Sequence, residues 1–429
     1  MSKTVKLGNI AHVDISSIDK KTKAKETAVK LCNYTDVYYN WTVTEDMITG
    51  FMEATAKDAD IDIFKLKQGQ VAITKDSETK DDIGMACYIA DDMDNVVLGY
   101  HCALITPNEN ELDGRFLNAI LQTDYARKYF GNSASGSGQR YTLIQDFIEA
   151  FPVPFFEYGY QKKIGKLFDD IDHKIINNNC LIECLNKKAR ILYNHWMVDY
   201  EYPGDGFKHY CSDGGDFRQI DELGIKAPAQ WKVHPLSDYL DCNLYSYKKS
   251  LHWDYINYLD TSNLTENLLG EVKRMDVQKK PSRAQRILSR NDILFSTVRP
   301  NQHHYGIIKE VVDNMIASTG FAVLTAKEDS TLSDLLYMFL TQENNLKALE
   351  VIANSSVSSY PSINNDDILN LKIVMPENIE ILYPLCKELD HIFELISNIQ
   401  YENKLLIRTR DFLLPLIISG QAQLIEAKS

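Results

Sequence analysis

The feature that most restricts the fold of this 429-residue chain is an internal repeat. A small polar run at 132–141 and another at 354–360 each lead into an aliphatic stretch that ends in proline, at Pro154 and at Pro376. Each stretch is followed by a long segment with helical periodicity. The copies lie about 220 residues apart, so the sequence predicts two halves of one design. A duplicated unit without a repeated catalytic motif favours binding at two related sites.

Shorter segments extend the match between the halves. Polar turns followed by short β-rich runs recur in both, and these runs predict hairpin-like strands. In chain order, the matched pairs are Val5–Leu7 with Trp231–Val233, Asn33–Asp36 with Asn257–Asp260, 64–73 with 287–295, Cys102–Ile105 with Phe321–Leu324, and the amphipathic helical patterns 117–129 with 332–349.

The two long helical segments, Gln161 to Asp199 and Ile381 to Ile418, carry a heptad-like apolar seam over about five repeats each. Alone, each helix would expose this seam to water. We therefore expect the two to pack together as an antiparallel coiled coil; the alternative is that each caps the core of its own half. Pro415 should end or kink the second helix. The seam positions proposed as a helical spacer, with Asn residues that would fix the register, are Ile164, Ile171, Ile175, Asn178, Leu185, Leu192, Leu389, Ile392, Ile396, Ile399, Asn403 and Leu406.

The predicted fold class is therefore α+β. It comprises two similar globular α/β domains, each followed by a long helix, with the helices paired antiparallel. The expected segments are 1–155 for the first domain, 156–200 for the first helix, 201–230 for a connector rich in turn residues, 231–376 for the second domain and 377–420 for the second helix.

Charge is distributed unevenly along the chain. The net charge of −14 argues against binding of nucleic acid by bulk charge alone. The stretch 268–309, however, holds nine Lys and Arg against three Asp and Glu. A solvated charged face and a phosphate-binding surface are both compatible with this stretch.

The eight cysteines are scattered and form no CxxC pair, which favours free buried thiols in a reducing cytoplasm over a zinc site. No apolar run reaches the roughly 18 residues that a membrane span needs. We therefore expect a cytoplasmic protein with no membrane partner.

Catalytic motifs are missing from the sequence. It contains no phosphate-binding P-loop, no glycine-rich dinucleotide fingerprint, no GxSxG elbow and no HExxH, so we assign no catalytic residue and no metal ligand. Asp260 with Glu271 and Lys273 has the loose form of a nuclease site, but such patterns are common by chance. His303 and His304 have no nearby carboxylate or cysteine in sequence, which favours a polar reading loop over a metal site.

Duplicated polar loops follow matched strands, at 74–80 in the first half and at 296–305 in the second. Arg, Asn, Gln, Ser and Thr can pair with base edges in a major groove, and flanking Lys and Arg can hold phosphates. The candidate DNA-binding residues are Lys75, Ser77, Thr79, Lys80, Gln139, Arg140, Lys273, Lys279, Lys280, Arg283, Arg299, Asn301, Gln302, His303, His304 and Tyr305.

In their order, twice over, these features resemble the DNA-specificity subunit of type I restriction-modification systems. The best carriers are residues 69–79 and 291–300, the small polar runs before Pro154 and Pro376, and the tail 410–421. The resemblance covers nearly the whole chain. It implies two target-recognition domains held apart by paired helices.

The resemblance further implies a non-catalytic subunit that binds double-stranded DNA, two methyltransferase subunits and the restriction-translocase subunits. S-adenosylmethionine, Mg²⁺ and ATP would belong to those partners, with no cofactor in this chain. The loops 74–80 and 296–305 share almost no residues, so the two half-sites should differ. The excess acid departs from a typical DNA binder; the methyltransferase subunits would supply much of the positive surface. The remaining alternatives are a scaffold or decoy that titrates methyltransferase subunits, and a self-contained nuclease or methyltransferase.

Overall fold

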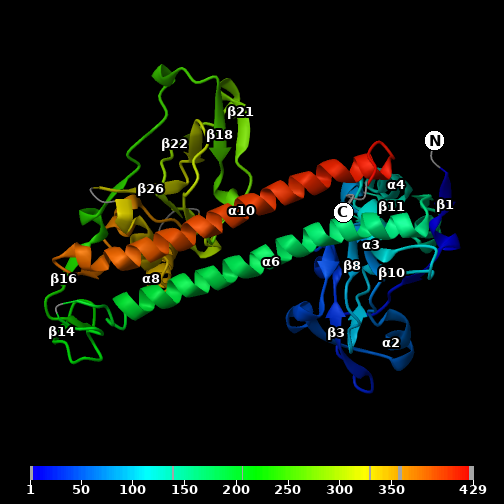
Figure 1. Cartoon of the computed structure of the whole chain (residues 1–429), viewed down its shortest axis with the longest axis horizontal. Coiled ribbons are helices and arrows are strands. Elements are labelled where there is room, and N and C mark those ends of the chain that lie inside the picture. The colour runs from blue at the N-terminus through cyan, green and yellow to red at the C-terminus, as the bar shows by residue number, and fades with distance from the viewer. Residues whose placement is uncertain (1–2, 138–139, 205, 328–329, 356–359, 425–429) are drawn as a thin grey trace, which may run out of the picture. The chain divides into compact units, whose positions relative to one another are not determined.

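The computed structural model describes residues 3–424 except 138–139, 205, 328–329 and 356–359. Its contacts divide the chain into two units, one of residues 1–177 with 404–429 and one of residues 178–403. Both long helices, α6 (Tyr158–Met197) and α10 (Tyr383–Ile418), therefore contribute to both units (Figure 1).

The first unit is built on two sheets. One has five strands in the order β2 (Ala11–Ile15), β10 (Cys102–Pro107), β6 (Val71–Thr74), β8 (Ala86–Ile89) and β4 (Thr42–Val43). The other has three, in the order β5 (Met52–Ala56), β3 (Thr27–Cys32) and β9 (Val96–Leu98). The β10–β6–β8 core is buried on both faces, and its strands therefore read as continuous apolar runs.

Short pairs and helices complete the first unit. β1 (Thr4–Lys6) pairs with β13 (Pro152–Pro154), and β12 (Arg140–Thr142) lies between β11 (Ser135–Ser137) and β7 (Asp76–Ser77). The helices are α1 (Tyr34–Tyr38), α2 (Asp58–Phe64), α3 (Gly114–Leu121), α4 (Asp124–Ser133) and α5 (Gln145–Glu149). Apolar residues of α3, α4 and the start of α6 bury one core with the five-stranded sheet.

The second unit repeats this plan with two four-stranded sheets. The first sheet has the order β17 (Leu240–Cys242), β26 (Phe321–Ala326), β23 (Ile293–Ser296) and β24 (Tyr305–Ile307). The second has the order β21 (Lys273–Asp276), β18 (Tyr255–Leu259), β25 (Met315–Ser318) and β22 (Ala284–Ile287). Shorter pairs are β16 (Lys232–Pro235) with β27 (Lys372–Met375), β19 (Leu264–Thr265) with β20 (Leu268–Leu269), and β14 (Phe217–Ile220) with β15 (Ile225–Pro228). The helices before α10 are α7 (Ser333–Leu340), α8 (Glu343–Ser355) and α9 (Asn365–Leu369).

Hydrogen bonds fix the match between the units and correct the sequence alignment at two places. The Leu7 amide donates to the Phe151 carbonyl and the Leu236 amide donates to the Leu371 carbonyl, so Leu7 matches Leu236 rather than Val233. Asn33 and Asp260 both cap the turn after a strand, so Asn33 matches Asp260 rather than Asn257. The sequence match of Ile73 with Phe295 holds, because each pairs with an alanine of the next strand, Ala103 or Ala322.

The antiparallel pairing of α6 and α10 is confirmed within each unit. In the second unit, the Asn178 side-chain amide donates to Asn403 Oδ1 and Glu402 Oε2, both at 2.8 Å. Lys188 faces Glu388, so residue numbers fall on one helix as they rise on the other. In the first unit, the amide of Leu424, beyond the end of α10, donates to the Tyr160 hydroxyl near the start of α6.

The predicted seam residues are buried or half-buried. Ile164, Asn178, Leu389, Ile392, Ile396 and Asn403 are buried, and Ile171, Ile175, Leu185, Leu192, Ile399 and Leu406 are half-buried. The helices also cap the globular cores, since Ile164 and Phe168 join the first core and Leu385 and Leu389 join the second. Pairing and capping therefore occur together.

Two sequence expectations need correction. α10 does not end at Pro415: its last residue is Ile418, and the Ser419 amide still donates to the Pro415 carbonyl. Proline at 415 removes the amide that would donate to the Asp411 carbonyl, and the helix continues for three residues beyond it. The cysteines are free but not all buried, because Cys180, Cys184 and Cys211 are exposed.

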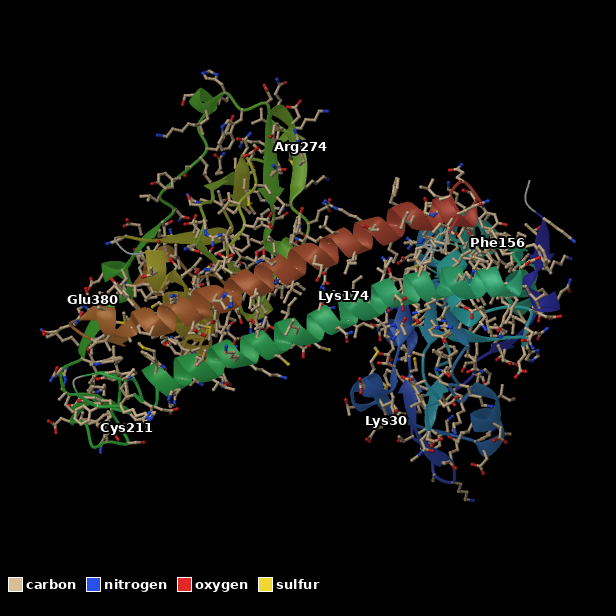
Figure 2. The ribbon with its side chains drawn as sticks, in the orientation of Figure 1. Lys30, Phe156, Lys174, Cys211, Arg274 and Glu380 are labelled. Carbon is tan, nitrogen blue, oxygen red and sulfur yellow. The ribbon has the colours of Figure 1, made fainter. Side chains whose placement is uncertain are left out.

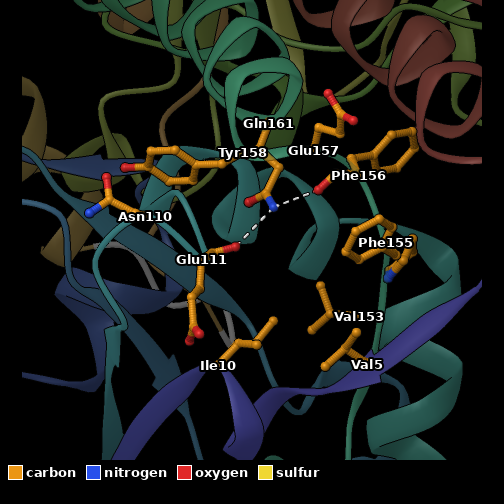
Figure 3. A pocket seen from close by; sticks show the side chains of 11 residues that line it. Val5, Ile10, Asn110, Glu111, Val153, Phe155, Phe156, Glu157, Tyr158 and Gln161 are labelled. Atoms are coloured by element: carbon orange, nitrogen blue, oxygen red, sulfur yellow. Dashed lines mark hydrogen bonds between the residues drawn. The ribbon is translucent and has the colours of Figure 1, made fainter.

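Gln161 ties the start of α6 to the first unit. Its side-chain amide donates to the carbonyls of Glu111 and Phe156, and its Oε1 accepts from the Asp113 amide (Figure 3). These bonds lie at a cavity of about 300 Å³ whose other walls include Val5 and Phe155. With Gln161 buried, two of these hydrogen bonds, to Glu111 and Asp113, hold the helix to the loop before α3.

Candidate nucleic-acid interface

At the same place in both units, the chain that leaves the central sheet pairs with a distant segment, and we call this pair of segments the ribbon. In the first unit, β6 runs on into β7, and the Leu143 amide donates to the Lys75 carbonyl at 2.8 Å. In the second, the chain after β23 forms a bridge from Val298 to Ser362, and the Ile363 amide donates to the Thr297 carbonyl at 2.9 Å. Both predicted polar loops therefore begin as strand rather than as free loop.

The shared bonds give a residue-by-residue match of the two ribbons. Lys75 matches Thr297, because these two carbonyls accept the equivalent bonds. It follows that Ser77 matches Arg299 on one strand, and that Arg140 matches Tyr360 on the other. The backbone is shared, whereas the side chains differ in size, charge and chemistry.

In the first unit, the ribbon carries a polar cluster around a buried carboxylate. We call Lys75, Asp76, Tyr100, His101, Arg140 and Thr142 the first cluster. Asp76 accepts from Thr142 Oγ1 at 2.6 Å and from Lys75 Nζ at 2.9 Å, and His101 Nδ1 lies 2.9 Å from it. The Lys75 amine also lies over the Tyr100 ring, 5.4 Å from its centroid.

Electrostatics favours a charged Asp76. Burial alone would raise the pKa of this carboxyl, but hydrogen bonds from Thr142, His101 and Lys75 outweigh burial, and the pKa lies below its usual value. The carboxylate therefore stays ionised at neutral pH and can hold cationic neighbours in place.

The exposed edge of the first cluster is the Arg140 guanidinium. Its NH2 group donates to the Tyr100 hydroxyl at 3.0 Å and lies 3.7 Å from Asp76. The Arg140 side chain is 62% exposed, whereas that of Asp76 is 8% exposed. The cluster thus has a buried anchor and a solvent-facing cation.

The predicted DNA-binding residues of the first unit differ in their exposure to solvent. Lys75 is buried and paired with Asp76, so its amine lies in the first cluster and not at the surface of the loop. Thr79 and Lys80 are exposed and Ser77 is half-buried. Lys80 lies over the Tyr141 ring, 5.5 Å from its centroid. Gln139 lies outside the described residues.

In the second unit, the exposed cation of the ribbon is Arg299. Its guanidinium lies over the Tyr360 ring, 4.9 Å from the centroid, and its backbone is left-handed with φ of 50°. His303, which directly follows the exposed pair Asn301 and Gln302, is also left-handed, with φ of 55°. These two turns place the short 3₁₀ helix Pro300–Gln302 between β23 and β24.

The rest of the predicted second loop is held by neighbours. His303 Nδ1 lies 2.7 Å from Glu266, and His304 Nδ1 lies 2.7 Å from the Leu264 carbonyl. Tyr305 is buried on β24 and stacks on Phe295, with ring centroids 5.8 Å apart, so it presents little surface for the predicted DNA contact. The strand begins one residue earlier than the polar run suggests.

The basic stretch lies on and beside the second four-stranded sheet. Lys273, Lys279 and Arg283 are exposed, while Lys280 is half-buried, lies over the Tyr247 ring and has its pKa lowered by burial. Arg283 forms an ion pair with Asp260. The Arg283 carbonyl accepts from the Thr319 amide, and the carbonyl of the next residue, Gly320, accepts from the Thr297 amide of the ribbon. Arg283 therefore adjoins the ribbon that carries Arg299.

Sequence reasoning missed Asp76, Tyr100, His101, Arg274 and Tyr360. Arg274, labelled in Figure 2, lies over the Tyr255 ring at 3.7 Å. Tyr100 and His101 reach Asp76 only because β10 pairs antiparallel with β6, with Cys102 opposite Thr74. A predicted pairing of these two strands would have been the signal.

The nuclease-like residues do not form a metal centre in the described part of the chain. One oxygen of the Asp260 carboxylate accepts from the Thr261 amide, and the other accepts from Arg283, so both oxygens are occupied. Across the residues with described positions, no group of three or more His, Cys, Asp or Glu could hold a metal ion. Within the same residues, no helix is long and apolar enough to cross a membrane.

Comparison with known proteins agrees with the repeated architecture. Residues 2–187 match the family model for the type I restriction modification DNA specificity domain. The type I restriction enzyme HindI specificity subunit of Haemophilus influenzae is 22% identical over 406 residues, covering 83% of this chain and 87% of that protein. The MjaIX specificity subunit of Methanocaldococcus jannaschii is 23% identical over 323 residues, covering 72% of this chain and 69% of that protein.

The fold is also that of a solved relative. The crystal structure of the type I restriction-modification S subunit from M. genitalium has a TM-score of 0.56 at 14% identity, covering 96% of this chain and 95% of that one. Residues 2–187 therefore match a type I restriction modification DNA specificity domain, and over most of its length the chain is similar to specificity subunits of type I restriction enzymes.

Proposed function

We propose that this chain reads a bipartite, asymmetric target in double-stranded DNA, with one recognition domain for each half-site. The observation that carries the proposal is the shared ribbon with unshared side chains. Arg140 and Ser77 in the first unit stand where Tyr360 and Arg299 stand in the second. Because base edges are distinguished by the side chains that meet them, two different sets read two different sequences.

Phosphate contacts would come from the exposed basic residues beside the ribbons. Lys80 in the first unit and Lys273, Lys279 and Arg283 in the second are exposed and can neutralise phosphates. The net charge of −14 means that this chain offers little general attraction for DNA. Positively charged surfaces on partner subunits would supply further contacts to the DNA phosphates.

The paired helices would set the distance between the half-sites. Asn178 and Asn403 bond across the seam, and a buried polar pair of this kind fixes the register of two helices. A fixed register makes a fixed spacer length, as in other readers of paired half-sites.

In this proposal the chain itself is non-catalytic. It would dock two methyltransferase subunits and the restriction-translocase subunits, which would carry S-adenosylmethionine, Mg²⁺ and ATP. The exposed faces of α6 and α10 offer apolar side chains for docking, among them Ile191 and Phe412, which are 68% and 67% exposed.

The test is methylation by a reconstituted complex. The purified chain is mixed with the methyltransferase subunits of its own system and S-adenosylmethionine, and methylated sites are mapped on genomic DNA. We expect one bipartite motif with different halves and a constant spacer. Complex formation without any sequence preference would instead support the scaffold or decoy alternative. Cleavage or methylation by the chain alone would support an enzyme.

A further inference from the structure

We propose that Arg140 reads a guanine in the first half-site and that Tyr100 is its positioning residue. This inference rests on the proposed function and adds to it a named base contact and the group that aims it. The residue pair lies outside the loop 74–80, where the sequence placed most of the reading residues of the first domain.

Both ribbons carry an arginine near the same place. Each ribbon presents one arginine at the matched positions, but from opposite strands: Arg299 stands on the strand that follows β23, whereas Arg140 stands on β12. The position matched to Arg299 in the first unit is Ser77, which is too short to replace a guanidinium. Arg140 is therefore the counterpart of Arg299 in chemistry, presented from the opposite strand of the ribbon.

The first cluster holds the Arg140 guanidinium at one of its nitrogens. Arg140 Nη2 makes both contacts of this guanidinium within the first cluster: it donates to the Tyr100 hydroxyl and faces Asp76. Within the described residues, NH1 and Nε make no such contact and lie on a side chain that is 62% exposed. A planar fork held at one corner loses less rotamer entropy when it binds, and it matches the O6 and N7 acceptors of guanine.

The charges around Arg140 favour a base over a phosphate as its partner. The buried Asp76 carboxylate offsets the charge of Lys75 at 2.9 Å and lies 3.7 Å from Arg140. Asp76 thus neutralises Lys75, one of the two cations that a phosphate could bind here, whereas a guanine edge needs only the guanidinium fork of Arg140. Lys80, exposed and without a carboxylate within 4.0 Å among the described residues, is better suited to phosphate.

The experiment measures methylation of a duplex library randomised in the first half-site, using the full chain in complex with its methyltransferase subunits. The first half-site is the half whose motif changes when residues of the first unit are substituted. We expect Arg140→Ala to lower discrimination for guanine at one base pair by about 5- to 150-fold, with the second half-site unchanged. Arg140→Lys keeps the charge but not the fork, so it should lose the same discrimination while retaining most overall binding.

Tyr100→Phe removes one hydroxyl and keeps the ring under Lys75. We expect a smaller loss at the same base pair, with the preference at every other position and the salt dependence of binding unchanged. Lys67→Ala is the matched control, because Lys67 is an exposed cation before the opposite end of β6. It should leave the motif intact.

Two outcomes would overturn the inference. One is an unchanged motif in Arg140→Ala. The other is weaker binding to all sequences alike with a shallower salt dependence, which identifies a phosphate contact. The proposed function would fail differently, since the wild-type complex would then show no sequence preference in either half.

Discussion

At the scale of single residues, function depends on where a charged group is anchored. Arg140 and Arg299 are both exposed cations beside an aromatic residue, Tyr100 or Tyr360. The first is also near a buried carboxylate, Asp76, whereas the matched position in the second unit is Val298. The two ribbons therefore surround similar cations with different charges.

Arg299→Ala should weaken discrimination at one position of the second half-site by about 1–3 kcal/mol. The guanidinium over Tyr360 is exposed, and its loss removes a bidentate donor without opening the core. Mapping of methylated sites with the reconstituted complex checks this. A motif identical to wild type at every position would show that Arg299 serves as a surface or phosphate residue.

Asp172 should make the first unit sensitive to pH. Burial raises the pKa of this α6 carboxyl to about 6, despite the nearby charge of Arg410 on α10. Because the folded-state pKa lies above the unfolded one, the folded state holds the extra proton between about pH 4 and 6. Stability is therefore greatest at low pH in this window and is lost as pH rises through 6.

Urea unfolding of wild type and Asp172→Asn at pH 5 and pH 7.5 isolates this effect, since all other groups are common to both. Wild type should lose about 1 kcal/mol relative to the variant on going from pH 5 to pH 7.5. An equal change in both proteins would show that Asp172 has an ordinary pKa.

At the scale of elements, heptad periodicity predicts the helices well and the site poorly. The ends of α6 and α10 lie within three residues of the periodic segments Gln161–Asp199 and Ile381–Ile418, because the apolar seam repeats regularly. Lys75 and Tyr305 are buried although both lie in polar runs, because a polar run does not show where a strand begins or ends. Asp76, Tyr100 and Arg140 meet through pairings between distant strands, and no local pattern records them.

Ion pairs join each recognition domain to the long helix that follows it. In the first unit, Arg115 on α3 lies 3.4 Å from Asp169 on α6. In the second, the buried Lys309 amine lies 2.8 Å from Asp334 on α7 and 2.9 Å from Asp390 on α10. Burial raises the pKa of Asp334 to about 6, so this carboxylate depends on Lys309 for its charge.

Lys309→Met should destabilise the second unit by about 3–5 kcal/mol, because it leaves Asp334 buried without a cation. Replacing both residues, as Lys309→Met with Asp334→Leu, should cost less than the single change, since no buried charge then remains. A double-mutant cycle in urea measures the difference. Additive losses would mean that the two groups do not interact.

At the scale of the whole molecule, the proposed spacer can be shortened without disturbing either recognition surface. Residues 174–180 of α6 face 401–407 of α10, as the bond between Asn178 and Asn403 shows. Removing both segments deletes one heptad from each helix and keeps the phase of the seam. Gln400, which bonds the Asn267 carbonyl, is retained.

The deletion shortens each helix by about 10 Å at about 1.5 Å per residue, which equals about three base pairs of DNA. The methylated motif should keep both half-sites and lose about three base pairs of spacer. A full-length variant with Asn178→Leu and Asn403→Leu is the control, because it removes the same hydrogen bond at unchanged length and should keep the original spacing. If the deletion variant methylates its target with the original spacing, the paired helices do not set the distance between half-sites, whereas a shorter spacer in that variant alone identifies helix length as the ruler.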